Sequence, residues 1–313
     1  MKSRISNGYR AMNKLGKAHF HSEEEAIKKL ESILWPDGPV CPRCKGQTRI
    51  TKVNGKTARP GLWRCGPCKR QFTVTIGTLF ERSHVPMHYW FQAVYLLSAS
   101  KKGFSACQLE RTLGVSYKTA WFMAMRIREA MRTGELAPFG VGGGAVEADE
   151  TFIGKKKGAK KRSAFHHKMK VLTLIDRETK QARSVVVKDL KAGTIAPILR
   201  DNLAREARLM TDEATHYKPV GREFSEHGVV NHKAEEWVRG DVYTNTAEGY
   251  FSVFKRGMRG IYQHCSEGHL HRYLAEYDFR YNNRQALGVD DERRAEAALS
   301  GIAGKRLYFR QPA

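Results

Sequence analysis

The spacing of hydrophobic and polar positions predicts helices in the N-terminal half of the chain. Ser22 and Glu25 have the spacing of a capping box, and the apolar Ile27 and Leu30 follow at helical intervals. This short helix is expected to end before WPDG at 35–38, which is a turn signal.

A second helical region covers residues 86–132. Ser105 and Gln108 form another capping box, Gly114 interrupts the pattern, and Ser116 begins a further helix. Two helices joined by a short turn that contains glycine have the outline of a helix-turn-helix, although many small helical hairpins share this outline.

The pattern changes after the glycine-rich stretch FGVGGG at 139–144. Short apolar runs indicate strands, and helical spacing returns between the later ones. The expected strands are 145–148, 171–175, 183–187, 208–211 and 228–230, and the expected helices are 194–205, 246–258 and 269–281. Three strands followed by alternating helices and strands indicate an α/β sheet with helices on its faces.

These patterns predict a multidomain protein of six segments. They are a basic tail (1–17), an N-terminal helix with a cysteine-containing region (18–80), a helical, helix-turn-helix-like region (81–138), a glycine-rich linker (139–144), an α/β domain (145–289) and a C-terminal tail (290–313). Short strand-like runs such as 71–76 are expected among the cysteines. The tail is expected to hold a helix and a strand-like end at 306–310.

The charge of the chain indicates the class of partner that it binds. Lys and Arg number 55 against 32 Asp and Glu, a formal net charge of +23. Such an excess favours a polyanion, and nucleic acid is preferred over an anionic membrane surface. No apolar run approaches the ~20 residues of a spanning helix, and the basic N-terminus lacks the apolar core of a secretory signal. We expect a cytoplasmic, nucleoid-associated protein.

Four of the six cysteines form two close pairs, which suits a metal better than disulfides. The pairs are Cys41 with Cys44 and Cys65 with Cys68. Two such knuckles can hold one Zn²⁺ in a closed tetrahedral site of four thiolates, and a closed site is structural. The alternative is four unrelated reduced thiols. The remaining Cys107 and Cys265 are interpreted as ordinary buried residues.

Three acidic residues stand where metal chemistry is plausible. Asp149 is expected at the end of the first strand of the α/β domain, Asp212 directly after 208–211, and Glu248 near the start of a helix. Oxygen ligands of this kind hold Mg²⁺ or Mn²⁺. Each acid alone is more often solvated, and Glu248 can simply favour the helix dipole. Glu147 competes with Asp149 because alternation places both on one side of the strand.

Several motifs occur in a fixed order along the chain. They are WPDG (35–38), VEADETFIG (146–154), MTDEA (210–214), VNH (230–232), TNTAEG (244–249), FKRGMRGIY (254–262) and HLHRYLAEYDFRYNNR (269–284). Together they resemble the zinc-ribbon (ISXO-type) DDE transposases of bacterial insertion sequences, and the resemblance covers about residues 20–310. The resemblance implies a ribonuclease H-like catalytic domain. It also implies Asp149, Asp212 and Glu248 as the metal ligands, which favours Asp149 over Glu147.

Other polar residues are expected near these ligands. Lys255 lies seven residues after Glu248, on the same helical face, and can reach a phosphate. His232 and Asn245 match motif positions of undefined role. His232 is as readily a structural histidine as a contact to phosphate or to metal-bound water.

Two regions are expected to contact DNA. A basic run between Gly154 and Lys170 directly follows the catalytic strand, where a solvated loop is the alternative to phosphate contact. The helix beginning at Ser116 is the candidate groove reader. The expected contacts are Lys155, Lys156, Lys157, Lys160, Lys161 and Arg162 in the run, and Tyr117, Lys118 and Arg126 in the helix.

The leading hypothesis is a DNA transposase. It would bind insertion-sequence ends, hydrolyse phosphodiesters to expose 3′-hydroxyls, and join these to target DNA by two-metal in-line transesterification, as a homodimer or higher oligomer. A non-catalytic zinc-ribbon and helix-turn-helix regulator explains only the N-terminal half. A tyrosine or serine recombinase lacks support because no clustered Arg/His/Arg/Tyr arrangement is evident.

Overall fold

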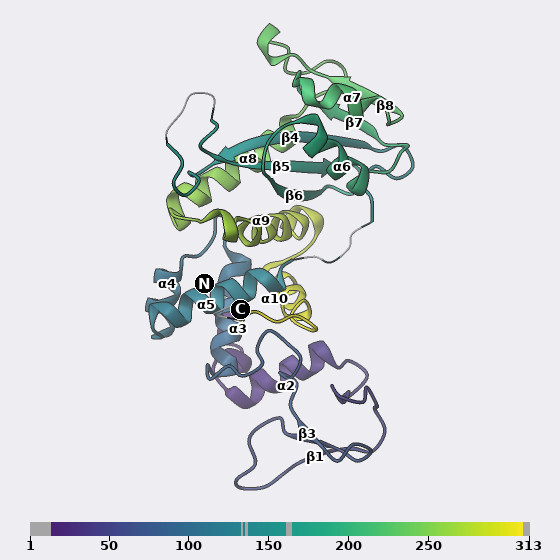
Figure 1. Ribbon diagram of the computed structural model, residues 1–313. Coiled ribbons are helices and arrows are strands. Elements are labelled where there is room, and N and C mark those ends of the chain that lie inside the picture. Colours follow the sequence, from purple (N-terminus) through teal and green to yellow (C-terminus); the bar gives the residue numbers. More distant parts are fainter. Residues whose placement is uncertain (1–13, 133, 135–136, 161–164, 309–313) are drawn as a thin grey trace, which may run out of the picture. The chain divides into compact units, whose positions relative to one another are not determined.

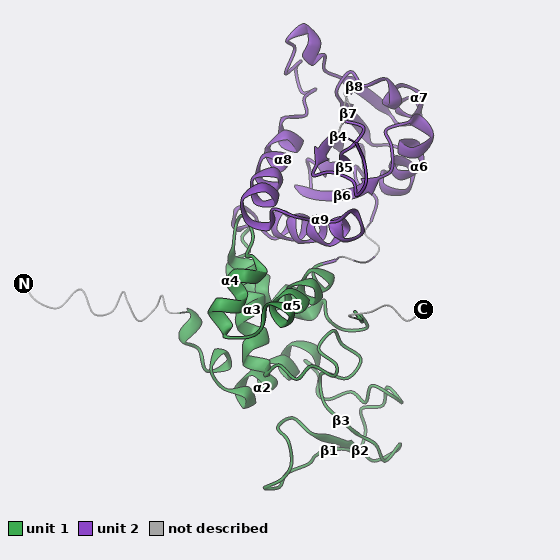
Figure 2. Ribbon diagram, turned by 60° about the vertical axis from the view of Figure 1, so that its left-hand side comes forward, with its two compact units in different colours: residues 1–131, 288–313 green, residues 132–287 purple. Residues whose placement is uncertain are grey.

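A computed structural model describes residues 14–132, 134, 137–160 and 165–308. The chain forms two compact units, of which Met1–Met131 with Gly288–Ala313 is unit 1 and Arg132–Leu287 is unit 2 (Figures 1 and 2). The C-terminal segment therefore belongs to the N-terminal unit and is not a separate tail. No helix in the described ranges is long and apolar enough to cross a membrane.

Unit 1 is built mainly from helices, three of which begin at predicted capping residues. The helices of at least eight residues are α2 (Glu23–Leu34), α3 (Met87–Ala99), α4 (Ala106–Leu113), α5 (Tyr117–Ala130) and α10 (Asp291–Ser300). Ser22 Oγ accepts from Glu25 N at the start of α2, and Ser105 with Gln108 forms a complete capping box. Gly114 ends α4 with φ +66°, a left-handed conformation that glycine adopts readily.

The C-terminal helix α10 is fixed to unit 1 by a long-range contact. Arg294 is buried, and its Nη1 donates to the carbonyl of Ser98 at the end of α3, 3.0 Å away. The prediction of a strand-like end at 306–310 is wrong for residues 306–308, which form no strand. Residues 309 and 310 lie outside the described part of the chain.

A small antiparallel sheet lies between α2 and α3 in the sequence. It has the order β1-β2-β3, formed by β1 (Ile50–Lys52), β2 (Trp63–Cys65) and β3 (Gln71–Phe72). The predicted strand at 71–76 is shorter than expected because the chain turns after Phe72, where Ile76 N donates to Thr73 O.

Unit 2 contains the predicted mixed α/β sheet. Its strands are β4 (Ala145–Ile153), β5 (Met169–Asp176), β6 (Gln181–Val187), β7 (Arg208–Thr211) and β8 (Glu226–Val229), in the order β6-β5-β4-β7-β8. Strands β4, β5 and β6 pair antiparallel, whereas β7 pairs parallel with both β4 and β8. β4 extends beyond the predicted 145–148, so Asp149 lies inside the strand and not at its end.

Helices cover both faces of this sheet (Figure 2). They are α6 (Ala192–Asn202), α7 (Lys218–Gly221), α8 (Asn245–Gly257) and α9 (Glu267–Asn282). Val146 and Ala148 of β4 pack into the apolar core that α6 shares. Because side chains alternate along a strand, Glu147 and Asp149 point to the opposite face, where α8 lies. α9 protects the edge strand β6, since Asp278 accepts from Ser184 N.

The glycine-rich stretch 139–144 is part of unit 2 and not a free linker. Phe139 is buried, and its backbone N–H donates to Asn202 O. Gly140 has φ +73°, its N–H donates to Asp176 Oδ2, and a Cβ there would lie 2.4 Å from the Ala207 Cβ. Close packing therefore requires glycine at this position. From the sequence alone, the same glycine is interpreted as part of a flexible linker.

Candidate active site and metal centre

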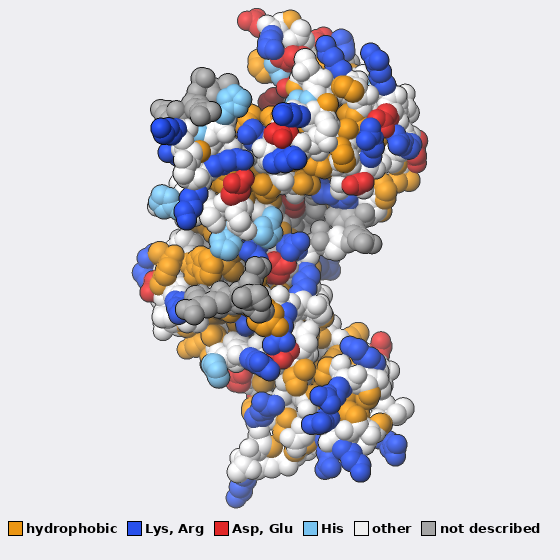
Figure 3. All heavy atoms as spheres, viewed as in Figure 1, with side chains coloured by type: hydrophobic (Ala, Val, Ile, Leu, Met, Phe, Trp, Pro, Cys, Tyr) orange, Lys and Arg blue, Asp and Glu red, His pale blue; other side chains and the backbone are white. Residues whose placement is uncertain are grey.

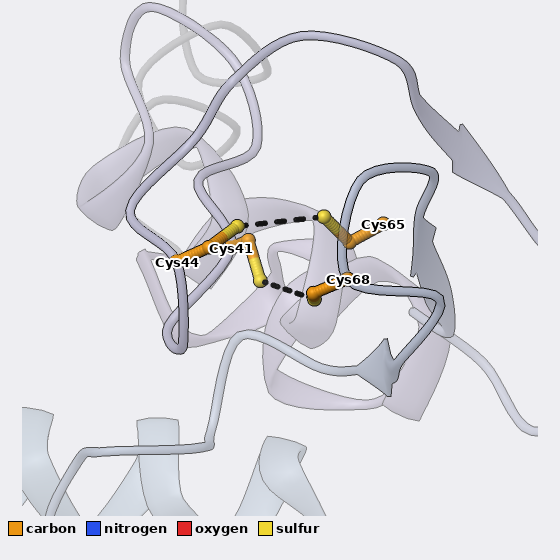
Figure 4. A group of neighbouring side chains, drawn as sticks. All are labelled: Cys41, Cys44, Cys65 and Cys68. Carbon is orange, nitrogen blue, oxygen red and sulfur yellow. Dashed lines mark hydrogen bonds between the residues drawn. The ribbon is translucent and has the colours of Figure 1, made fainter.

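The four paired cysteines come together in unit 1 (Figure 4). All four sulfur atoms lie within 4.8 Å of one another, and the Cys41–Cys68 and Cys44–Cys65 sulfur pairs are each 3.6 Å apart. A tetrahedron with Zn–S bonds of about 2.3 Å has edges of about 3.8 Å, so the spacing fits one zinc ion. Four thiolates leave no open position, which makes the site structural.

The cysteine cluster has only a small apolar surrounding. Cys41, Cys65 and Phe72 are buried together, with Trp35 and Trp63 partly buried against them. So few apolar groups cannot stabilise a three-stranded sheet alone, and metal binding is the usual source of the missing folding free energy. The other two cysteines are not buried as expected, because Cys107 is exposed and Cys265 is partly exposed.

Asp149 lies in β4, and Asp212 is the first residue after the neighbouring strand β7. The parallel β4–β7 pairing ends with Glu147 opposite Met210, two residues before each of these carboxylates. The negative charge of Asp212 is among those that raise the pKa of Asp149, so the two carboxylates lie within electrostatic reach of each other. Asp149 belongs to the face of the sheet that carries α8, because it follows Glu147 by one strand period and Glu147 contacts the start of that helix.

Glu147 holds the start of α8 against this face. Its buried carboxylate accepts from Thr246 N (3.0 Å), Thr246 Oγ1 (2.8 Å) and Ala247 N (3.0 Å). The same carboxylate pairs with Arg177 Nε at 2.7 Å. All of its oxygens are thus used in binding the first turn of a helix and one guanidinium. The structure gives Glu147 a supporting role at the start of α8.

The first turn of α8 presents Glu248 beside His232. Glu248 is exposed, and its Oε1 lies 3.7 Å from His232 Nε2, which is also 3.4 Å from Thr244 Oγ1. Asn245, the first residue of α8, is exposed. Lys255 is half-buried two turns further along the helix. His232, Asn245 and Glu248 therefore lie at the start of α8, whereas Lys255 lies in its last turn.

Electrostatics supports a cation site here. Burial raises the pKa of Asp149 to about 8, with further contributions from the negative charges of Glu150, Asp212 and Glu248. Burial also raises the pKa of Asp212. These carboxylates repel one another, and a bound cation would remove that repulsion. Burial lowers the pKa of Lys255, while Asp149 and Glu248 act in the opposite direction, so Lys255 is within electrostatic reach of both.

The donor set fits Mg²⁺ or Mn²⁺ in chemistry, though the carboxylates are more widely spaced than the cysteines. All three candidate ligands offer oxygen, as these cations prefer. Among the described residues, only the four cysteines form a group whose ligand atoms all lie within 4.8 Å of one another. A site with room for substrate oxygens and water does not require tighter contact.

Sequence reasoning missed a pair on the opposite face of β4. Glu150 Oε1 lies 2.5 Å from His216 Nε2, and both side chains are largely buried. His216 lies in a single 3-10 turn, Thr215–Tyr217, just after Asp212. The alternation of the strand predicts that Glu150 points away from Asp149, but nothing local in the sequence identifies its partner 66 residues away.

The expected DNA contacts have mixed surroundings. Lys155, Lys157 and Lys160 are exposed, whereas Lys156 pairs with Glu267 at 3.1 Å. Lys161 and Arg162 lie outside the described residues. Lys and Arg side chains are spread across the face in Figure 3.

On α5, Tyr117 and Lys118 are exposed at the first turn. Arg126 instead packs within unit 1, its guanidinium 4.6 Å from the Phe122 ring centre and 6.0 Å from that of Trp90. This packing does not favour the predicted role of Arg126 as a DNA contact.

Comparisons with known proteins show the family of the chain. Residues 142–282 match the model of the ISXO2-like transposase domain, and residues 21–71 match that of the transposase zinc-ribbon domain. A protein in transposable element ISH50 of Halobacterium salinarum is 30% identical over 281 residues, which cover 83% of this chain and 91% of the relative. The chain therefore belongs to the family of zinc-ribbon, ISXO2-like transposases.

Proposed function

We propose that the protein is a metal-dependent DNA transposase of the DDE type, with Asp149, Asp212 and Glu248 as its metal ligands. The observation that supports the proposal is that Asp149 in β4 lies within electrostatic reach of Asp212, directly after the neighbouring strand β7, and of Glu248 on the helix that Glu147 ties to the sheet. Mg²⁺ or Mn²⁺ held there would activate the attacking oxygen and stabilise the leaving oxygen of a phosphodiester.

The residues around the carboxylates would position the DNA. Lys255 supplies a cation within electrostatic reach of Asp149 and Glu248, where it can bind a phosphate oxygen. His232 would orient the Glu248 carboxylate through its Nε2, and Asn245 offers an exposed amide at the helix start. In this proposal the chain hydrolyses one strand at each element end and then joins the freed 3′-hydroxyl to target DNA, without a covalent protein intermediate.

The domain assignments follow from the same proposal. We propose that unit 2 is ribonuclease H-like; its three antiparallel strands followed by two parallel strands, with helices on both faces, support this. The zinc ribbon and the α4–α5 helix-turn-helix would bind the element ends, and the basic residues after β4 would bind phosphates. We further propose that the protein acts at the nucleoid, as a dimer or higher oligomer that brings two ends together.

An end-cleavage assay tests this function. Labelled DNA carrying the element's own ends is incubated with the protein and Mg²⁺, Mn²⁺ or EDTA, and free 3′-ends and joined products are resolved on denaturing gels. We expect cleavage and joining only with a divalent cation. Binding without any cleavage would favour a non-catalytic regulator, and a protein–DNA adduct that survives denaturation would favour a covalent recombinase.

A further inference from the structure

An exposed tryptophan lies next to the proposed catalytic residues, and the proposed function gives it no role. Trp237 is 54% exposed, and the neighbouring Val238 is 51% exposed. Tryptophan has the largest apolar area of any side chain to remove from water and is usually buried. A half-exposed indole is therefore an informative exception to this rule. Trp237 lies between β8 and α8 in the sequence, and α8 carries the third carboxylate, Glu248.

The indole is linked to the carboxylate through one histidine. The Trp237 and His232 ring centres are 4.6 Å apart with the planes tilted by 38°, and His232 Nε2 is 3.7 Å from Glu248 Oε1. One side of the indole therefore packs on His232. The exposed half remains available to a further flat group at the edge of the catalytic site.

The loop that carries Trp237 is held in place by its own hydrogen bonds. Asn231 N donates to the Glu236 carboxylate, and Glu236 N donates back to Asn231 O. Arg239 and Val242 exchange two backbone hydrogen bonds, and Arg239 Nη2 donates to Val229 O at the end of β8. A ring presented on such a loop is preorganised, so little conformational entropy is lost when it binds a partner.

The surroundings of Trp237 suit a nucleic acid. Lys233 has 85% of its side chain exposed and lies 3.7 Å from Glu213, and Arg239 has 59% exposed and lies 3.8 Å from Glu236. Aromatic rings interleaved with cations bind unpaired bases, because the ring stacks on the base while the cations contact phosphates. A protein partner would meet few apolar groups beside Trp237 and Val238, since the flanking Glu236 and Arg239 are charged.

We infer that Trp237 is a stacking platform for one unpaired nucleobase beside the phosphate that is cleaved or joined. The inference rests on the proposed function, since it places that phosphate at Glu248. Stacking on the indole stabilises a nucleotide that has left the duplex and so gives the carboxylates access to the backbone. Trp237 is a positioning residue in this scheme and takes no part in proton or phosphoryl transfer.

Two substitutions at the same position separate stacking from simple packing. Trp237→Phe keeps an aromatic face, and Trp237→Leu keeps apolar packing on His232 without one. Loss of one base stack corresponds to roughly 5- to 150-fold in rate. We expect Trp237→Leu to lose cleavage and joining by that factor on fully paired ends, and Trp237→Phe to stay within about threefold of the native protein. Val141→Ala, at another exposed apolar position of unit 2, is the control and should behave as native.

Substrates with a mismatched nucleotide next to the scissile phosphate provide the decisive readout. Because the base is already unpaired there, we expect the Trp237→Leu variant to recover most of its activity on these ends. 2-Aminopurine at the same position should change its emission when the native protein binds, but not with Trp237→Leu. Equal loss on paired and mismatched ends, or no loss on paired ends, would overturn the inference. If the native protein cleaves neither substrate, the proposed function itself has failed.

Discussion

Removing the Glu147 carboxylate tests how α8 is held over the sheet. Glu147 is fully buried and accepts four hydrogen bonds, from Arg177, from the backbone and hydroxyl of Thr246, and from the backbone of Ala247. Glu147→Ala leaves a buried guanidinium and two helix N-terminal N–H groups without these acceptors. Glu147→Gln keeps the shape and one carbonyl acceptor but loses the charge.

The contacts set the size of the effect. Breaking a buried ion pair on one side costs about 3–5 kcal/mol of unfolding free energy. We expect Glu147→Ala to fall in that range, which lowers the melting temperature of a unit of this size by roughly 6–20 °C. Glu147→Gln should lose about 1.5–3 kcal/mol, the usual value of hydrogen bonds to a charged group. Glu178→Ala, at an exposed carboxylate after β5, should change stability by less than about 0.5 kcal/mol.

Thermal unfolding measures the total loss of stability, and hydrogen exchange shows which part of the structure is destabilised. The amides of Thr246 and Ala247 should exchange at least about tenfold faster in Glu147→Ala, while β6 amides change less. Activity should also fall, because Glu248 loses its support, although binding of Mn²⁺ at saturating concentration should persist. Unchanged stability together with unchanged exchange at these two amides would refute the reasoning. Loss of Mn²⁺ binding in a still-folded variant would restore Glu147 as a ligand.

Four further predictions concern the metals and the DNA. Cys41→Ser should lose zinc and weaken DNA binding, while Mn²⁺ binding by unit 2 persists. The exposed Cys107→Ser is the matched control, and elemental analysis measures the zinc content. Native protein free of zinc would contradict the prediction of a zinc ribbon. Because the Asp149 pKa is raised from 3.8 to about 8, the folded protein holds a proton that the unfolded chain has lost between these values, so the stability of the metal-free protein should fall from about pH 4 to pH 8. Mg²⁺ affinity should correspondingly rise by up to about tenfold per pH unit until about pH 8, and a pH-independent affinity measured by calorimetry would argue against a protonated Asp149. Binding of end DNA should weaken at least about tenfold between 50 and 200 mM salt, as measured by fluorescence anisotropy, and a flat response would exclude the electrostatic role of the +23 charge. Lys255→Ala should reduce cleavage by roughly tenfold, less than loss of any triad carboxylate, because a point charge aids positioning without holding the ions; an effect as large as that of Asp149→Ala would contradict this order.

Local signals in the sequence were sufficient for the helix starts and for the zinc ligands. Ser22, Ser105 and Ser116 cap their helices as predicted, because each capping bond spans only three residues. The cysteines meet because each pair is held by one tight turn. Asp149 and Asp212 could be placed near strands for the same reason, although the length of β4 was underestimated.

The remaining features depend on partners that are distant in the sequence. β4 continues through the polar Asp149 and Glu150 because β5 pairs with it as far as Ile153, and the local alternation gives no sign of this. The role of Glu147 depends on Arg177 and on Thr246, which lies 99 residues away. The interpretation of 139–144 as a linker failed because glycine composition does not distinguish a flexible segment from one that must pack closely.

The most direct measurement of the central claim is end cleavage and joining by conservative variants of the three carboxylates. Asp149→Asn, Asp212→Asn and Glu248→Gln preserve the shape of each side chain, and end binding with zinc content confirms that each variant is folded. The account predicts that each variant binds end DNA as the native protein does, yet loses at least about a thousandfold in both cleavage and joining with Mg²⁺ or Mn²⁺. Full activity in all three variants would contradict the carboxylate metal mechanism.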